Sequence, residues 1–221
     1  MNAFPITPTP NKFFMLPGPF HGRLFPKASL DFAYCTCALN WLSQVPKAVA
    51  DHMSPAWNTG KVHYTGAKQE VVEAYSHHYA HDIKSFLEAR AEELVAGGLM
   101  ALLVPSDPSA TSFTTPTEID LLGSCLLDMA NKEIIERSNS FSIERMEILD
   151  NPGKRTLCSA KARAAYLRAV FEGMLINHFG SEVMDGLFDC YEKKIAASPH
   201  FLDPDNEKSI IIFVLLKSKA E

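Results

Sequence analysis

The sequence predicts an α/β fold with a mostly parallel sheet, and three consecutive patterns support that class. Residues 29–39 (SLDFAYCTCAL) form a run of small and apolar side chains. A helical pattern covers residues 67–95, and a second apolar run, LMALLVP, occupies residues 99–105. A strand, a long helix and a second strand in that order form a βαβ unit, whose two strands lie parallel in one sheet.

The first apolar run, residues 29–39, lacks a strict alternation of apolar and polar side chains. That composition is typical of a strand buried on both faces of a parallel sheet. A short helix is expected after it, near Pro46–His52.

The helical pattern of residues 67–95 consists of one apolar stripe at steps of three and four residues. Glu and Lys fill the opposite face, which is therefore expected to face solvent. Gly97 and Gly98 are expected to end the helix, so that the strand at 99–105 begins at once. The members of the stripe are Val72, Tyr75, Tyr79, Ile83, Phe86, Leu87 and Leu94.

The remaining elements follow from the same two periodicities, about 3.6 residues for helices and 2 for strands, together with turn signals. The β-branched composition of residues 209–217 favours a strand in particular. In order, we expect a polar loop at 106–117, a helix at 119–135, a half-exposed strand at 141–149, two helices within 160–195 that part at Phe179 and Gly180, and the final strand at 209–217.

Composition excludes several classes of partner. The 221 residues are 47% hydrophobic and 21% charged, with a formal net charge of −5 and no long basic run. Nucleic acids and anionic membranes attract clustered Lys and Arg, so neither is an expected partner. No apolar stretch approaches the roughly 20 residues that span a bilayer. The N-terminus lacks a signal-peptide pattern, and we expect the five scattered cysteines to be reduced thiols of a cytoplasmic protein.

Known short motifs do not identify a chemistry. His77 and His81 have the i, i+4 spacing of a zinc-binding pair, but His78 stands where the protease motif needs its Glu, so a solvated helix face is favoured. GxSxG, P-loop and GxGxxG patterns are absent from the sequence. The residues alone therefore predict an α/β domain with a ligand site at the carboxyl ends of its strands.

Seven ordered segments resemble those of the plant SABATH methyltransferases, which transfer a methyl group from S-adenosylmethionine to small carboxylic acids or xanthine nitrogens. The resemblance implies an incomplete methyltransferase-type, Rossmann-like sheet with an α-helical cap. We accordingly expect an irregular arm at 1–16 and a partial methyltransferase domain at 17–221, with cap helices within about 119–195. The segments are PGPFHGRLFP (17–26), LNWLSQVP (39–46), SPAWNTGKVHY (54–64), DIKSFLEARAEELVAGGLM (82–100), LLGSCLLDMA (121–130), FSIERMEILD (141–150) and the stretch 163–217.

The resemblance implies two cofactor-binding residues, Pro19 and Phe20. The family's PGSF segment places a Ser and a Phe against the adenosine, and here Pro19 stands where the family has Ser. A proline has neither a hydroxyl nor a backbone N–H, so one polar contact is lost. We therefore expect a weakened site for S-adenosylmethionine.

The resemblance also implies three substrate-binding residues after the first strand, Cys37, Asn40 and Trp41. Family members have an aromatic or similar residue and a His–Trp pair at these positions. Trp41 keeps an indole N–H, which is a donor for a substrate carboxylate, and Asn40 can form hydrogen bonds but cannot titrate. The expected partner is a small carboxylic acid, and without the family context core packing is favoured for Trp41.

Asn58 is the single candidate metal ligand, because the family's Asn in the PAWN segment can contribute to a magnesium site. The companion DSFN-like segment of the family is not found between the helix at 119–135 and the strand at 141–149. One amide ligand holds a hard cation weakly, so we do not expect magnesium to bind.

The family begins with a segment that holds a Tyr and a Gln, a DLGCSSG-like glycine turn and a later acidic residue for the ribose. None of these occurs in residues 1–16. We therefore expect an N-terminally truncated family member with impaired activity, and we assign no catalytic residue. The alternative is a non-catalytic truncated isoform. Family members are typically dimers, so we expect a homodimer or a heterodimer with a full-length relative.

Overall fold

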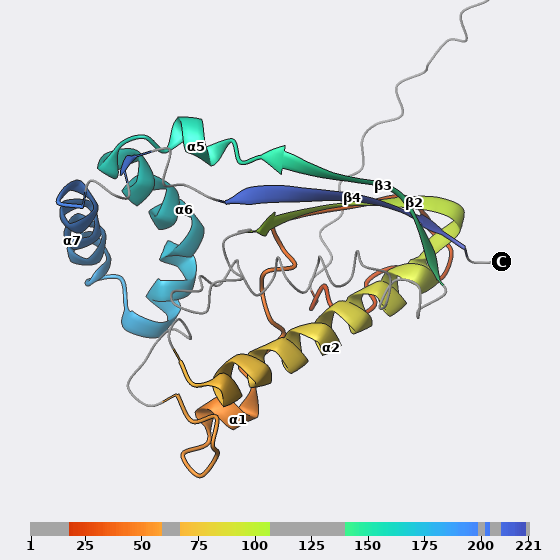
Figure 1. The fold of residues 1–221 in the computed structure, drawn as a ribbon, viewed down its shortest axis with the longest axis horizontal. Coiled ribbons are helices and arrows are strands. Elements are labelled where there is room, and N and C mark those ends of the chain that lie inside the picture. Colours follow the sequence, from red (N-terminus) through yellow and green to blue (C-terminus); the bar gives the residue numbers. More distant parts are fainter. Residues whose placement is uncertain (1–17, 59–66, 107–139, 199–201, 204–208, 220–221) are drawn as a thin grey trace, which may run out of the picture.

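A computed structural model describes residues 18–58, 67–106, 140–198, 202–203 and 209–219. The expected arm at 1–16, the loop at 106–117 beyond its first residue and the helix at 119–135 lie outside the described residues. The elements, in chain order, are β1 (Leu30–Thr36), α1 (Lys47–Ala50), α2 (Gln69–Glu93), β2 (Leu94–Ser106), β3 (Phe141–Asp150), α5 (Gly153–Thr156), α6 (Ala160–Phe179), α7 (Met184–Ala196) and β4 (Ile210–Ser218) (Figure 1).

The four described strands form one sheet in the order β1-β2-β4-β3. β1 and β2 are parallel, whereas β4 is antiparallel to both β2 and β3. β1, β2 and β3 therefore run in one direction and β4 runs in the other. The predicted α/β class is confirmed. β4, the predicted C-terminal strand, lies between β2 and β3.

The predicted βαβ unit is present as β1, α2 and β2. α2 lies along one face of the sheet (Figure 1), and its apolar stripe enters the main core from Tyr79 onward. Near the start of the helix, Tyr75 packs instead against a smaller cluster that contains Val71. Ile83 and Leu87 are each 1% exposed, and they belong to the same cluster as Met100, Val104 and Leu216 of the sheet. Burying each such side chain contributes roughly 1.5–3 kcal/mol, which explains why this 25-residue helix is fixed against the sheet.

The junction between α2 and β2 differs from the prediction. α2 ends at Glu93 and the extended backbone of β2 begins at Leu94, so the helix stops before Gly97 and Gly98 rather than at them. Gly97 has a φ of 75°. A Cβ on Gly98 would lie 3.3 Å from the carbonyl oxygen of Asp31, so the glycine pair permits the close approach of β1 where its register with β2 shifts.

β1 is less buried than its composition predicts. Phe32 and Tyr34 are 55% and 58% exposed, so a strand covered on both faces is wrong for the described part of the chain. The physical reason is that Phe32 and Tyr34, two residues apart, share one face of β1, and their exposure shows that this face is open to solvent. β1 is also the outermost strand of the described sheet and pairs only with β2. Its other edge is not covered by a described strand.

The two predicted helices of residues 160–195 are confirmed as α6 and α7, which pack together at one end of the sheet (Figure 1). The Ser159 hydroxyl accepts a hydrogen bond from the Ala162 amide at the start of α6, and Gly180, with φ 83°, ends it. Arg168 joins the two helices by binding Glu172 and Asp185.

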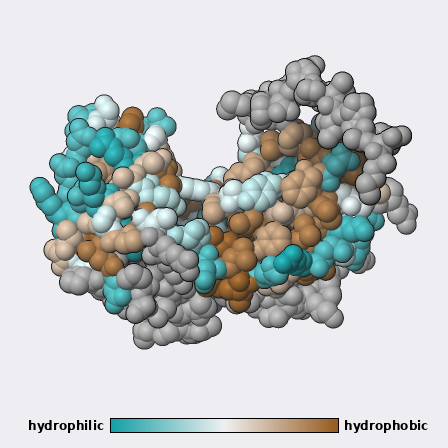
Figure 2. All heavy atoms as spheres, turned by 90° about the horizontal axis from the view of Figure 1, so that it is seen from above, coloured by the Kyte–Doolittle hydropathy of each residue, from teal (hydrophilic) through white to brown (hydrophobic). Residues whose placement is uncertain are grey.

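Figure 2 shows the difference in surface character between the two ends of the molecule. The helical end is mostly hydrophilic, apolar surface gathers over the sheet, and the surface dips between them. Ile148 of β3, 67% exposed, is one of the apolar side chains that remain in solvent. None of the described helices is long and apolar enough to cross a membrane.

Candidate functional site

The loop after β1 carries the three predicted substrate-binding residues. The Cys37 amide donates to Leu103 O at 2.9 Å, which continues the pairing of β1 with β2 by one residue. Cys37 itself has a φ of 53°, a left-handed conformation that turns the chain away from the sheet. The Trp41 amide then donates to Ala38 O at 3.0 Å and closes a turn. This turn places Asn40 and Trp41 at the carboxyl end of β1.

Trp41 lies between the sheet and the helical end of the molecule. Its ring centroid is 5.9 Å from that of Phe171 on α6, at an interplanar angle of 58°. The side chain is 39% exposed, and none of the described residues accepts a hydrogen bond from its indole N–H. Trp41 is thus fixed by apolar contact on one side and offers a polar donor on the other.

Asn40 presents a second polar group beside this indole. Its Oδ1 atom is buried and has no hydrogen-bond partner among the described residues. A buried, unsatisfied amide oxygen costs about 1–3 kcal/mol. A bound molecule with a suitably placed donor would remove that cost.

A second loop, residues 18–26, brings the predicted cofactor residues to the same region. His21 lies within it, is 7% exposed, and its Nε2 atom is 2.9 Å from Trp41 O. A carbonyl oxygen can only accept, so the Nε2 atom carries the hydrogen. Phe20, the preceding residue, lies against His21 with ring centroids 4.0 Å apart. The two loops that carry Phe20 and Trp41 are therefore in direct contact.

The end of α2 holds the 18–26 loop through two buried charges. Arg90 donates to Phe20 O and Gly22 O, each at 2.9 Å. The Glu93 carboxylate accepts from the amides of Leu24 and Phe25. Burial raises the pKa of the Glu93 carboxyl, but the hydrogen bonds from Arg90 and from these amides outweigh it and hold the pKa below its usual range.

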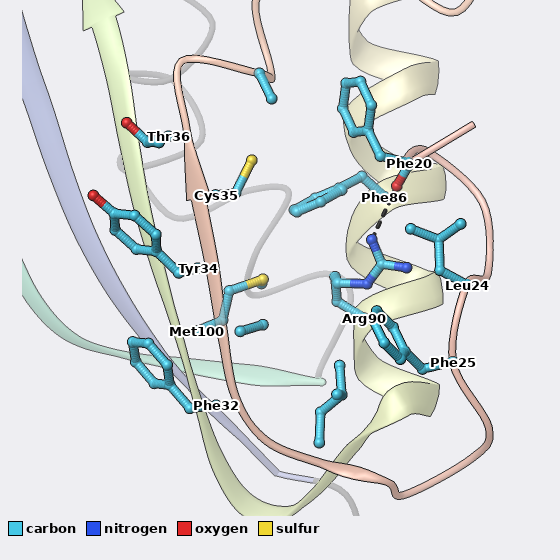
Figure 3. A pocket seen from close by; sticks show the side chains of 13 residues that line it. Phe20, Leu24, Phe25, Phe32, Tyr34, Cys35, Thr36, Phe86, Arg90 and Met100 are labelled. Carbon is cyan, nitrogen blue, oxygen red and sulfur yellow. Dashed lines mark hydrogen bonds between the residues drawn. The ribbon is translucent and has the colours of Figure 1, made fainter. Parts of the chain in front are cut away.

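A cavity of about 500 Å³ lies between the 18–26 loop, β1 and α2 (Figure 3). Figure 3 shows Phe20 and Phe86 on the α2 side of the cavity and Cys35 pointing toward them from β1. Burial raises the pKa of the Cys35 thiol, which is therefore a poor nucleophile. The lining residues are Phe20, Leu24, Phe25, Leu30, Phe32, Ala33, Tyr34, Cys35, Thr36, Ala38, Phe86, Arg90 and Met100.

The predicted site residues divide between this cavity and its surroundings. Phe20 lines the cavity, and its flat ring suits a purine placed there, whereas Pro19 is exposed and has no donor to offer. Cys37, Asn40 and Trp41 do not line it; they lie past the end of β1 and reach the Phe20 segment through His21.

Residues predicted as metal ligands are not brought together in the described part of the chain. The Asn58 amide donates to Val49 O at 3.4 Å, which ends a turn after α1. The described residues contain no group of three or more His, Cys, Asp or Glu side chains that could hold a metal ion. His77 and His81 lie on exposed positions of α2.

Sequence reasoning missed the buried polar side chains of α2. Asp82, Arg90 and Glu93 are 3%, 5% and 0% exposed, although the helix pattern assigned charged residues to the solvent face. One signal was available, because Asp82, Phe86 and Arg90 are spaced four residues apart and so share a face with the core stripe. Charges on an apolar face of a helix indicate partners from another part of the chain.

Comparisons with known proteins agree with this geometry. The family model described as SAM dependent carboxyl methyltransferase matches residues 8–138 and 131–219. The chain is 35% identical over 242 residues to Loganic acid O-methyltransferase of Catharanthus roseus, covering 96% of this chain and 65% of that protein. It is 36% identical over 233 residues to an Arabidopsis thaliana protein named Probable S-adenosylmethionine-dependent methyltransferase At5g37990, covering 92% and 64%.

A solved structure, "Loganic acid methyltransferase with SAH", has the same fold. Its TM-score is 0.77 at 34% sequence identity, over 96% of this chain and 69% of that chain. The chain spans just under two thirds of the length of the curated relatives named above. The two matched stretches of the family model overlap at residues 131–138, a segment that begins within the expected helix at 119–135 and ends before β3.

Proposed function

Because the chain belongs to the family of SAM-dependent carboxyl methyltransferases, we propose that it takes part in methyl transfer from S-adenosylmethionine to a small carboxylic acid. We propose further that the 221 residues alone carry this activity weakly. The observation that carries the proposal is the hydrogen bond of 2.9 Å from His21 Nε2 to Trp41 O. It brings the candidate cofactor residue Phe20 next to the candidate substrate residues.

On the cofactor side, Phe20 offers an aromatic surface at the wall of a 500 Å³ cavity, which suits the adenine ring. Pro19 contributes van der Waals contact only, since it lacks the N–H and the hydroxyl of a serine. Bound S-adenosylmethionine supplies an electrophilic methyl group on its sulfonium. The partly apolar cavity would exclude water from that group.

On the substrate side, we assign carboxylate binding to Trp41 and Asn40. The indole N–H of Trp41 has no described acceptor. The side-chain N–H groups of Asn40 are a second donor for a carboxylate, whereas the buried Oδ1 atom of Asn40 is an acceptor that an ionised carboxylate cannot satisfy. A carboxylate is already ionised at neutral pH, so no base is needed. These residues would orient the carboxylate oxygen, which forms the new bond to the methyl carbon. Cys37, at the turn after β1, would limit the size of the acid.

Weak activity follows from the physics of this reaction. Methyl transfer without acid–base catalysis depends on holding the two reactants in line, and that positioning accounts for several kcal/mol of rate enhancement. The glycine turn and the ribose-binding acid of the family do not occur in residues 1–16. The contacts available to the cofactor are therefore fewer than in the family pattern.

The test is calorimetric titration of the purified 221-residue chain with S-adenosylhomocysteine, followed by a methyl-transfer assay on a panel of small carboxylic acids. Weak binding that Phe20→Ala abolishes would support the proposed site. Phe179→Ala is the matched control, because Phe179 is an exposed aromatic residue at the far end of α6. Binding that survives Phe20→Ala, or full activity with the isolated chain, would contradict the proposal.

A second candidate function is that of a non-catalytic partner for a longer family member. The observation that favours it is the position of β1 at the edge of the described sheet, together with the exposure of Phe32 and Tyr34 on one face of this strand, 55% and 58%. An exposed strand edge with aromatic side chains invites pairing with another chain. Light scattering of the chain alone and mixed with a full-length relative would detect a homodimer or a heterodimer.

Two further expectations belong to the same proposal. We expect magnesium to be dispensable, because Asn58 is a single amide ligand, and addition of a chelator to the assay tests this. We also expect the protein to work in the cytoplasm, which imaging of a tagged chain would check.

A further inference from the structure

Asp82 of α2 is a buried residue, 3% exposed, and its carboxylate accepts hydrogen bonds from the loop after β1. The Ser43 hydroxyl donates to Asp82 Oδ1 at 2.7 Å, and the Ser43 amide donates to Oδ2 at 2.8 Å. Both oxygens of one carboxylate are thus occupied by one residue that is 39 positions away in the sequence. Hydrogen bonds to an ionised acceptor are the stronger kind.

Two histidines complete the surroundings of Asp82. His78 Nε2 lies 3.6 Å from Asp82 Oδ2 and 3.2 Å from Ser43 Oγ. His21 Nε2 lies 4.0 Å from Asp82 Oδ2, but its hydrogen points to Trp41 O, which is closer. No described Lys or Arg pairs with Asp82.

The combination of Ser43, His78 and Asp82 does not have the geometry of a nucleophilic serine. The Ser43 hydroxyl hydrogen is directed at the carboxylate, and the same His78 nitrogen faces both of the other groups. In a working triad the histidine lies between the two and uses a different nitrogen for each. The cluster therefore holds a shape and does not activate a nucleophile.

The part held in place is the turn that carries Asn40 and Trp41. His21 fixes the carbonyl of Trp41, and Asp82 fixes the backbone and side chain of Ser43, two residues further on. The neighbouring Leu39 and Leu42 pack against the main core, and Trp41 itself has the turn bond to Ala38 and the ring contact with Phe171. The direction of the indole N–H thus depends on the anchoring of the backbone on its C-terminal side.

We propose that Asp82 is a positioning residue for carboxylate recognition, which acts through Ser43 and together with His21 to orient Trp41. This inference rests on the proposed function, because it gives Trp41 the role of donor to the acid. Asp82 itself does not contact the substrate. Its loss lets the turn move and lowers the affinity for the acid without removing a single substrate contact.

The test uses the fluorescence of Trp41 in the full 221-residue chain. Trp57→Phe leaves Trp41 as the sole tryptophan, since the chain has two. In that background Asp82→Asn is expected to raise the acrylamide quenching constant of Trp41 at least about twofold, because one ionised acceptor of two hydrogen bonds is lost. Ser43→Ala is expected to act in the same direction with a smaller effect, and Ser43→Thr, which keeps the hydroxyl, to restore the original value.

Glu88→Gln is the matched control. Glu88 is a carboxylate on the same helix with a 61% exposed side chain, and it pairs with Lys84 rather than with the loop. Unchanged quenching in Asp82→Asn, with only a lower melting temperature, would overturn the inference, because a merely structural role predicts that result. Should Asp82→Asn not fold, the Ser43→Ala and Ser43→Thr pair decides by the same criterion.

A titration with benzoate, a plain aromatic carboxylate, separates this inference from the proposed function. If benzoate protects Trp41 from quenching, Asp82→Asn should weaken that protection by about tenfold, while Glu88→Gln leaves it unchanged. Equal benzoate affinity in Asp82→Asn and the parent chain would overturn the role in recognition. Absence of any benzoate effect in the parent chain would contradict the proposed function, and the quenching comparison would still decide whether Asp82 positions Trp41.

Discussion

Arg90 and Glu93 form a buried ion pair one helical turn apart at the end of α2, with Arg90 Nε 2.6 Å from Glu93 Oε2. Their side chains are 7% and 0% exposed. Both residues also bind the backbone of the 18–26 loop, so the pair supports the segment that carries Phe20. The stability of the protein and the shape of its candidate cofactor site therefore depend on the same two charges.

Replacing Glu93 by Gln should be strongly destabilising. The substitution keeps the shape but leaves the Arg90 charge buried without its partner, which costs roughly 3–5 kcal/mol. The free energy of unfolding from urea titration measures the loss. Glu92→Gln is the control, because Glu92 forms an exposed pair with Arg23 and should cost less than about 1 kcal/mol. Equal losses in the two variants would contradict this account.

The stability should also fall in acid because of Glu93. Its pKa in the folded protein lies below the unfolded value of about 4.3. The stabilisation is therefore complete above the unfolded value and is lost as the pH falls toward the folded value. Unfolding free energies measured from about pH 5 down to about pH 2 should decline less steeply in Glu93→Gln than in the parent chain. Parallel curves would assign the acid sensitivity to other carboxyl groups.

Trp41→Phe should separate acid binding from cofactor binding. The phenyl ring retains apolar contact with Phe171 but has no N–H, so the affinity for a carboxylic acid should fall by about tenfold. The affinity for S-adenosylhomocysteine should stay the same. Calorimetric titration with each ligand tests the two halves of the prediction. A matching loss for both ligands would show that the substitution disturbs the whole region.

Pro19→Ser should strengthen cofactor binding. Serine restores a hydroxyl and a backbone N–H, and one new hydrogen bond is worth roughly 0.5–1.5 kcal/mol, or an affinity increase of about twofold to tenfold. The Pro19 carbonyl, which accepts from the Gly22 amide, is kept. Pro26→Ser is the control, since it adds the same backbone freedom at an exposed position of the same loop. An increase in cofactor affinity in both variants would instead attribute the effect to the greater backbone flexibility of the loop.

Alkylation should distinguish the two cysteines of β1 and its turn. Burial raises the pKa of Cys35, so less of its thiol is ionised at pH 8, whereas Cys37 is exposed. Iodoacetamide should therefore modify Cys37 before Cys35, as measured by tandem mass spectrometry of a time course. Faster labelling of Cys35 would show that the cavity is open to solvent and reagent.

Local patterns were sufficient to predict most elements. The stripe of Ile83 and Leu87 predicted α2, and the turn at Gly180 predicted the division of α6 from α7, because these features depend on neighbours within one or two turns of helix. The order of the strands was not predictable in this way. The paired residues of β4 and β2 are more than 100 positions apart in the sequence, and the composition of neither strand indicates which strand it pairs with.

The candidate site was predicted in part for the same reason. Phe20 and Trp41 were predicted as site residues because two short segments resemble those of the family. Their proximity in the fold, which the hydrogen bond from His21 to the Trp41 carbonyl shows, was not predicted. The burial of Asp82 and Arg90 was not predicted, because their loop partners are 39 and 70 residues away in the sequence. From the sequence alone, a charged side chain that forms hydrogen bonds with a distant backbone segment cannot be distinguished from one on the surface.

The position of β4 has a consequence for the order of events when the chain folds. Among the described strands, β3 pairs only with β4, and β4 is the last of them in the sequence. Through these contacts β3 can therefore join the sheet only after residue 218 has been synthesised. β1, α2 and β2 contact one another at shorter separations and can assemble earlier. Contacts between distant residues slow folding because long loops must close first. Refolding experiments should therefore show a slow final phase in which β4 inserts between its two neighbours, and until then the apolar edges of β2 and β3 are open to aggregation.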